Sequence, residues 1–117
     1  MCKRFRGRKY AKSSSGARVA HSVRFHPEAA EEVQAVSDRY RERSAGAAAG
    51  FIAELNYAIE RVAELPETWP SYNANTRRFI FRVYPFSLVY RIAENEIEIV
   101  AVAHFKRKPG YWTSRVD

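Results

Sequence analysis

With 117 residues, of which 46% are hydrophobic, the chain is the right size for one domain with a single core. Its one cysteine, Cys2, cannot form an internal disulfide, no apolar stretch approaches the roughly 18 residues of a membrane span, and the first 24 residues lack the apolar segment of a signal peptide. These features exclude a disulfide-stabilised or membrane-spanning fold and favour a cytoplasmic protein.

The net charge of +7 is distributed unevenly along the chain. Residues 1–24 contain eight Lys or Arg and no acidic residue, residues 25–75 contain four basic and nine acidic residues, and residues 76–117 contain eight basic and four acidic residues. A cationic surface of this kind favours phosphate groups or acidic proteins as partners. The three histidines lie far apart, and no zinc-binding spacing or phosphate-cradling glycine loop is present, so we expect no metal and no cofactor.

Residues 1–18 mix basic residues with a Ser-Ser-Ser-Gly run and show little apolar patterning, which indicates a disordered tail. Such a tail could hold nucleic acid by charge alone, but an extension without a specific role is the favoured interpretation. The folded domain is predicted over residues 19–117.

Two helices are predicted after a short strand at residues 19–25. Pro27 suits a first helical position, and apolar residues at helical spacing predict about four turns after it. Ser44-Ala45-Gly46 interrupts this helix and can cap the next one, which runs to about Leu65 before Pro66 ends it. Since so short a connection cannot separate the helices, they should form an antiparallel hairpin whose apolar face needs a sheet to cover it.

Residues 66–75 are predicted as a loop by their two prolines and two asparagines, with Trp69 as its anchor to the core. Three strands should follow. Residues 78–83 place Phe79, Phe81 and Val83 on one face, and residues 86–92 are apolar at the even positions. In the turn at residues 93–96, Asn95 best suits a left-handed conformation. Residues 97–104 are apolar on both faces, which predicts a central strand that ends at His104.

These elements predict an α+β fold. Its order is one strand, an antiparallel helical hairpin, and then a three-stranded antiparallel meander, with the helices packed on one face of the sheet. The cationic residues of the meander would by default be a solvated face, but an acidic or phosphate partner would explain an uncovered one. Candidate contacts of this kind are Arg78, Arg82, Arg91, Lys106, Arg107, Lys108, Tyr111 and Trp112.

Over about residues 22–115 the chain resembles the RelE/ParE superfamily of toxins from bacterial type II toxin-antitoxin modules. The resemblance is carried by the order of elements, by Leu65-Pro66 closing the second helix, and by Arg78 entering the first sheet hairpin. It is also carried by the motifs at residues 84–85, 89–91 and 99–104. The ending HFKRKPGYWTSR is most similar to the ParE side. The resemblance implies a growth-inhibiting toxin associated with plasmid stabilization and held in a hetero-oligomer by a cognate antitoxin with an acidic amphipathic segment.

Two mechanisms occur in this superfamily, so the fold does not decide between them. ParE-like members poison DNA gyrase without known catalytic residues, whereas RelE-like members are metal-independent endonucleases of messenger RNA on the ribosome. The second mechanism would need a proton-transfer group and cations at the phosphate. The candidates are His104, Arg78, Arg82, Arg91, Arg107 and Tyr111.

Phe105 stands where several RelE-like nucleases carry a tyrosine, and phenylalanine cannot transfer a proton. The ParE-like, non-enzymatic mechanism is therefore favoured. The alternatives are the ribosome-dependent nuclease and a non-catalytic module that binds nucleic acid.

Overall fold

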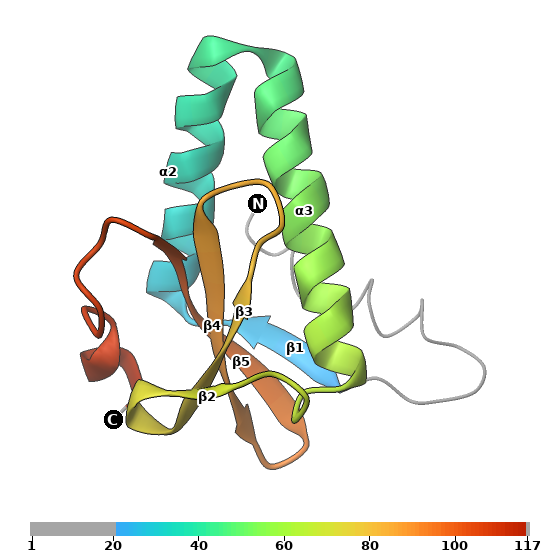
Figure 1. Cartoon of the computed structure of the whole chain (residues 1–117), viewed down its shortest axis with the longest axis vertical. Coiled ribbons are helices and arrows are strands. Elements are labelled where there is room, and N and C mark those ends of the chain that lie inside the picture. The colour runs from blue at the N-terminus through green and yellow to red at the C-terminus, as the bar shows by residue number, and fades with distance from the viewer. Residues whose placement is uncertain (1–20, 117) are drawn as a thin grey trace.

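The computed structural model describes residues 21–116, in which a helical hairpin lies against a five-stranded sheet (Figure 1). The predictions for residues 1–18 lie outside the described residues. In chain order the elements are β1 (Ser22–Phe25), α2 (Pro27–Arg43), α3 (Ala45–Glu64), β2 (Ser71–Tyr72), the 3-10 turn η2 (Asn73–Asn75), β3 (Thr76–Ile80), β4 (Phe86–Ala93), β5 (Glu96–His104) and the 3-10 turn η3 (Thr113–Val116).

The predicted helical hairpin is confirmed, and local capping explains its ends. The His26 ring accepts a hydrogen bond from the Glu28 N–H at 3.1 Å, and Pro27 occupies the first turn of α2. Ser44 serves both helices, because its N–H donates to the Tyr40 carbonyl and its Oγ accepts from the Ala47 N–H at 3.0 Å. One residue therefore ends α2 and begins α3.

The strand order of the sheet is β1-β5-β4-β3-β2. The predicted antiparallel meander of β3, β4 and β5 is confirmed, and β1 joins it by parallel pairing with β5. The segment predicted wholly as a loop contains the short edge strand β2, which pairs with the start of β3. The turn between them uses positive φ at Ala74 and Asn75, and the Arg77 guanidinium donates to the Trp69 carbonyl at 2.7 Å.

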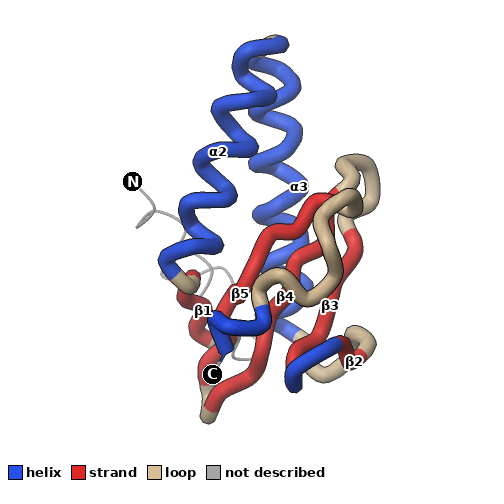
Figure 2. Tube along the Cα trace, turned by 90° about the vertical axis from the view of Figure 1, so that its left-hand side faces the viewer, coloured by secondary structure: helices blue, strands red, loops and turns tan. Residues whose placement is uncertain are grey.

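Both faces of the central strands are covered. The larger core lies between the helices and the sheet, where Phe51 and Leu55 of α3 join Phe79, Leu88 and Tyr90 of the strands. Trp69 packs edge-on against Phe79, with ring centroids 4.7 Å apart, as its predicted anchoring role requires. On the opposite face a smaller core is formed by Val89, Val100, Ala101 and Trp112. The C-terminal segment thus covers the face that the helices leave open (Figure 2).

Two local predictions were wrong. Val83, expected on the buried face, is 80% exposed, because β3 ends at Ile80 and the chain has left the sheet by Val83. In the turn between β4 and β5 the left-handed residue is Glu94 and not Asn95. Strand periodicity predicts a face only while the strand continues, and the point where pairing stops depends on the neighbouring strand.

Gly50 of α3 lies against Tyr84, and this close approach makes it sensitive to substitution. A Cβ at position 50 would come within 2.4 Å of the Tyr84 hydroxyl, which donates to the Ala47 carbonyl at 2.8 Å. Gly50→Ala is therefore expected to lower the free energy of unfolding by about 1–3 kcal/mol in urea denaturation, despite the better helix propensity of alanine.

Gly46 provides the matched control, since its nearest neighbour outside the helix backbone would be the Ser44 Oγ at 3.9 Å. Gly46→Ala should leave stability unchanged or raise it by up to about 1 kcal/mol. Equal stabilisation by both substitutions would show that Tyr84 can move away at no cost.

Candidate functional site

The candidate site is a pocket on the sheet face opposite the helices, beside the C-terminal end of β5. Its volume is about 250 Å³, and residues from β2, β3, β4, β5 and the segment after β5 line it. Arg78 comes from β3, His104 ends β5, and Arg107 and Lys108 follow β5. The pocket therefore brings together four of the predicted cationic or titratable residues, as their sequence positions around the meander suggested.

Aromatic rings hold the two arginines of this pocket. The Arg78 guanidinium carbon lies 4.3 Å from the Tyr72 ring centroid, and that of Arg107 lies 3.7 Å from the Tyr111 ring centroid. Within residues 21–116 neither guanidinium has a carboxylate partner at ion-pair distance. A guanidinium stacked on a ring keeps its N–H edge available for a carboxylate or a phosphate. The pocket is consequently suited to an acidic group.

His104 is oriented by its own turn. Its Nδ1 accepts a hydrogen bond from the Lys106 N–H at 3.0 Å, and its ring packs edge-on against Phe86, with centroids 5.0 Å apart. Because Nδ1 is a hydrogen-bond acceptor here, Nε2 carries the proton when the ring is neutral. His104 also lines a second pocket of about 410 Å³ between α2 and β5, together with the apolar Val36 and Val102.

Tyr111 is tied into a different network. Its hydroxyl donates to Glu32 Oε2 of α2 at 2.7 Å, and Arg115 donates to the same oxygen at 2.9 Å. Burial of the ring, followed by the hydrogen bond to Glu32, raises the pKa of Tyr111. A hydroxyl with a raised pKa that already donates to a carboxylate is a poor source of a proton for a leaving group. This network fixes the C-terminal segment to α2.

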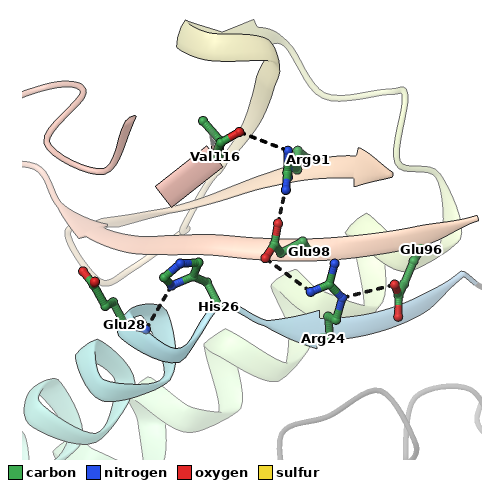
Figure 3. Close-up of polar contacts among 7 residues, drawn as sticks. All are labelled: Arg24, His26, Glu28, Arg91, Glu96, Glu98 and Val116. Carbon is green, nitrogen blue, oxygen red and sulfur yellow. Dashed lines mark hydrogen bonds and ion pairs between the residues drawn. The ribbon is translucent and has the colours of Figure 1, made fainter. Parts of the chain in front are cut away.

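Among the predicted contacts, four do not line this pocket: Arg82, Arg91, Lys106 and Tyr111. Arg82 packs over the Tyr57 ring on the helical side, with its guanidinium carbon 3.8 Å from the ring centroid. Arg91 donates to Glu98 at 2.7 Å and to the Val116 carbonyl at 3.3 Å (Figure 3). Trp112 does line the pocket, but it is 1% exposed and belongs to the smaller core.

Six lining residues were not among the residues predicted for the site, and two of them, Tyr72 and Ser87, carry hydroxyl groups. Tyr72 lies in the segment predicted as a loop, and only its pairing with Thr76 brings it beneath Arg78. Ser87 is buried and lines the pocket. The strand alternation had already placed Ser87 on the face opposite Phe86, so its position was available from the sequence, whereas that of Tyr72 was not.

The fold and the pocket define the class as a small α+β domain with a pocket lined by cationic residues. The chain belongs to the ParE toxin family, because the family model described as the ParE toxin of the type II toxin-antitoxin system, parDE, matches residues 23–109. The resemblance to the ParE side is thereby confirmed. No curated protein matches the chain.

The fold has a counterpart among solved structures. One titled "Chromosomal ParDE TA system from P. aeruginosa" superposes with a TM-score of 0.64 at 17% identity, covering 73% of this chain and 96% of the other. At this level of identity the likeness concerns the fold. Within the described part of the chain, neither helix combines the length and the apolar character needed to cross a bilayer.

Proposed function

We propose that this ParE-family toxin inhibits growth in the cytoplasm by binding DNA gyrase, and that a cognate antitoxin neutralises it. The observation that carries the proposal is the contrast between cations and proton-transfer groups at the pocket. Arg78 and Arg107 are stacked and unpaired within the described residues, whereas the Tyr111 hydroxyl donates to Glu32 and Phe105 has none to offer. Such a site supports binding of an acidic surface more readily than acid-base catalysis.

The antitoxin partner is proposed to present an acidic, amphipathic segment that folds as it binds. The pocket between α2 and β5 supports this, because apolar Val36, Phe86 and Val102 line it together with Arg39 and Lys106. An amphipathic segment could place apolar side chains against the first group and carboxylates against the second. Association should be rapid and sensitive to salt. The toxin and antitoxin would then form a hetero-oligomer.

A RelE-like ribonuclease remains the second candidate function, supported by one observation. Arg78, His104 and Arg107 line a single pocket, which is where phosphate chemistry would need them. A non-catalytic module that binds nucleic acid through the same cations is the third. The nuclease requires His104 to transfer a proton, whereas binding of gyrase or of nucleic acid does not. This difference provides the test.

Reversing the charges of Lys106, Arg107 and Lys108 to Glu is expected to abolish growth inhibition, because cationic and arginine contacts anchor such interfaces. His104→Ala is expected to change it little. If His104 transferred a proton, its removal would instead lower activity by about 10²–10⁴-fold. The parent and both variants are compared at equal protein levels for growth, gyrase supercoiling inhibition, DNA double-strand breakage and messenger RNA cleavage.

A control for the position of the charge reversal changes Arg41 and Arg43 to Glu, two exposed residues near the end of α2 that lies far from the sheet (Figure 1). This variant should remain toxic. Co-purification of the parent with the product of the adjacent reading frame tests the antitoxin. Messenger RNA cleaved at the ribosomal A site by the parent, but not by His104→Ala, would replace the gyrase proposal with the nuclease.

A further inference from the structure

Three of the large hydrophobic residues that residues 21–116 expose lie at one end of the sheet. Val83 is 80% exposed, Phe105 is 54% exposed and Ile80 is 53% exposed. Ile80 ends β3, Val83 lies in the connection to β4, and Phe105 follows β5. Figure 2 shows that the β3–β4 connection and the end of β5 meet at the same end of the sheet. We call Ile80, Val83, Pro85 and Phe105 the hairpin-tip surface.

A buried carboxylate fixes the β3–β4 connection. The Glu54 side chain of α3, only 5% exposed, accepts from the backbone N–H of Arg82, of Val83 at 3.0 Å and of Tyr84 at 3.4 Å. Together with the Tyr84 hydroxyl bond to Ala47, these contacts attach the connection to α3 at several points. Val83 is thus presented on a fixed backbone and not on a free loop.

Phe105 is joined to the same structure. Its N–H donates to the Pro85 carbonyl at 3.0 Å, and Phe86 pairs with His104 in the sheet immediately before it. The two exposed apolar side chains therefore come from connections that hydrogen-bond to each other. Their relative positions are determined by β4 and β5 and not by flexible chain.

This arrangement brings no packing benefit at Val83. Burying a carboxylate is costly unless it is paired and hydrogen-bonded, and here three backbone donors and the Arg82 guanidinium compensate it. Tyr84, one of those donors, packs against the core, whereas Val83 remains exposed. An apolar side chain held rigidly in solvent loses little entropy when it binds. Such preorganisation is typical of interface anchors.

The charge around this surface indicates the partner. Residues 80–86 and 104–109 contain four Lys or Arg and no Asp or Glu. Arg82 is held beside Val83 by the Tyr57 ring and by an ion pair with Glu54. The positive charge that is unpaired within residues 21–116 therefore comes mainly from Lys106, Arg107 and Lys108, which follow Phe105 directly. An apolar centre with a cationic rim complements an apolar recess bordered by carboxylates.

We propose that the hairpin-tip surface is where this toxin contacts its target protein, with Val83 and Phe105 inserted into an apolar recess that acidic side chains surround. The inference rests on the proposed function, since it assigns the contact surface of that activity. Glu54 is a positioning residue, because it holds the backbone of residues 82–84 and forms an ion pair with the Arg82 guanidinium.

The test uses the full chain with Val83→Ser and Phe105→Ser combined. Loss of two interface anchors should weaken gyrase inhibition, measured by supercoiling, by at least about 10-fold. Because both side chains are exposed, the urea midpoint should stay that of the parent, and the adjacent-frame antitoxin should still co-purify. The conservative pair Val83→Ile and Phe105→Leu should retain inhibition.

Leu65→Ser is the matched control, because Leu65 is 50% exposed at the end of α3, away from the hairpin tip. It should inhibit as the parent does. The inference would be overturned if the double serine variant inhibited gyrase as strongly as the parent. It would also be overturned if that variant lost antitoxin binding but still inhibited gyrase.

Growth arrest separates the inference from the proposed function. If the parent arrests growth without inhibiting gyrase, the gyrase proposal fails, and the inference stands only if the double serine variant no longer arrests growth while Leu65→Ser still does. A parent that neither arrests growth nor inhibits gyrase overturns both.

Discussion

Trp112→Ala is expected to lower the free energy of unfolding by about 3–5 kcal/mol, the usual cost of removing a large buried aromatic side chain. Trp112 is 1% exposed and joins Val89, Val100 and Ala101 in the core that covers the sheet face away from the helices. Its ring also contacts Tyr72, with centroids 5.7 Å apart. Urea denaturation of the two proteins, followed by circular dichroism, measures the difference.

Trp112→Phe serves as the control, because it keeps an apolar ring in the same place. It should lower the free energy of unfolding by clearly less than the alanine substitution does. Trp112→Ala is also expected to reduce toxicity, because less of the protein will be folded. The sequence pattern had instead suggested that Trp112 contacts a partner at the surface. A Trp112→Ala protein as stable as the parent would mean that the C-terminal segment contributes no core.

Glu32→Ala is expected to lower the free energy of unfolding by about 3 kcal/mol, since breaking a largely buried ion pair leaves its partners unsatisfied. Glu32 accepts from three donors, which are the Val102 N–H at 2.9 Å, the Tyr111 hydroxyl at 2.7 Å and Arg115 at 2.9 Å. Beyond Ile99, β5 has no pairing with β1, so Glu32 satisfies an edge donor that the sheet leaves open. Its removal also leaves the Arg115 side chain, 9% exposed, with only Glu28 as an ion-pair partner among residues 21–116.

Glu31→Ala is the matched control on the same helix, because Glu31 is exposed and should change stability by no more than about 0.5 kcal/mol. Limited proteolysis gives a second measurement. Residues 105–116 should be cleaved faster in Glu32→Ala than in Glu31→Ala, since Glu32 connects that segment to α2. Equal cleavage and equal stability of the two variants would contradict the assigned role.

Several features of this protein follow from short-range sequence signals. Pro27 and Ser44 mark helix ends because capping depends on neighbouring residues, and the structure has both ends there. The uninterrupted apolar run of β5 predicted a strand covered on both faces, and β5 lies between β1 and β4 with both faces buried. The order of motifs likewise identified the ParE side of the superfamily, which the family comparison confirms.

The candidate site was only partly predictable, because it depends on which strands pair and where pairing ends. Arg78 and Arg107 line one pocket, but Arg91 donates to Glu98 and does not line it. The alternation of apolar residues along the strand does not predict this pairing. Tyr72 reaches Arg78 only through a two-residue strand that has no periodic signal.

Sequence alone thus determined the helices, the meander and the cationic ending of this chain, because each depends on residues close together along it. Tertiary structure decided which of those residues remain at the surface. Trp112 became core because the C-terminal segment folds back over Val89 and Val100, and Val83 became exposed because Glu54, nearly thirty residues earlier, holds its backbone outside the sheet. Contacts between residues so distant in sequence leave no local pattern, and they form only when helices and strands have packed together.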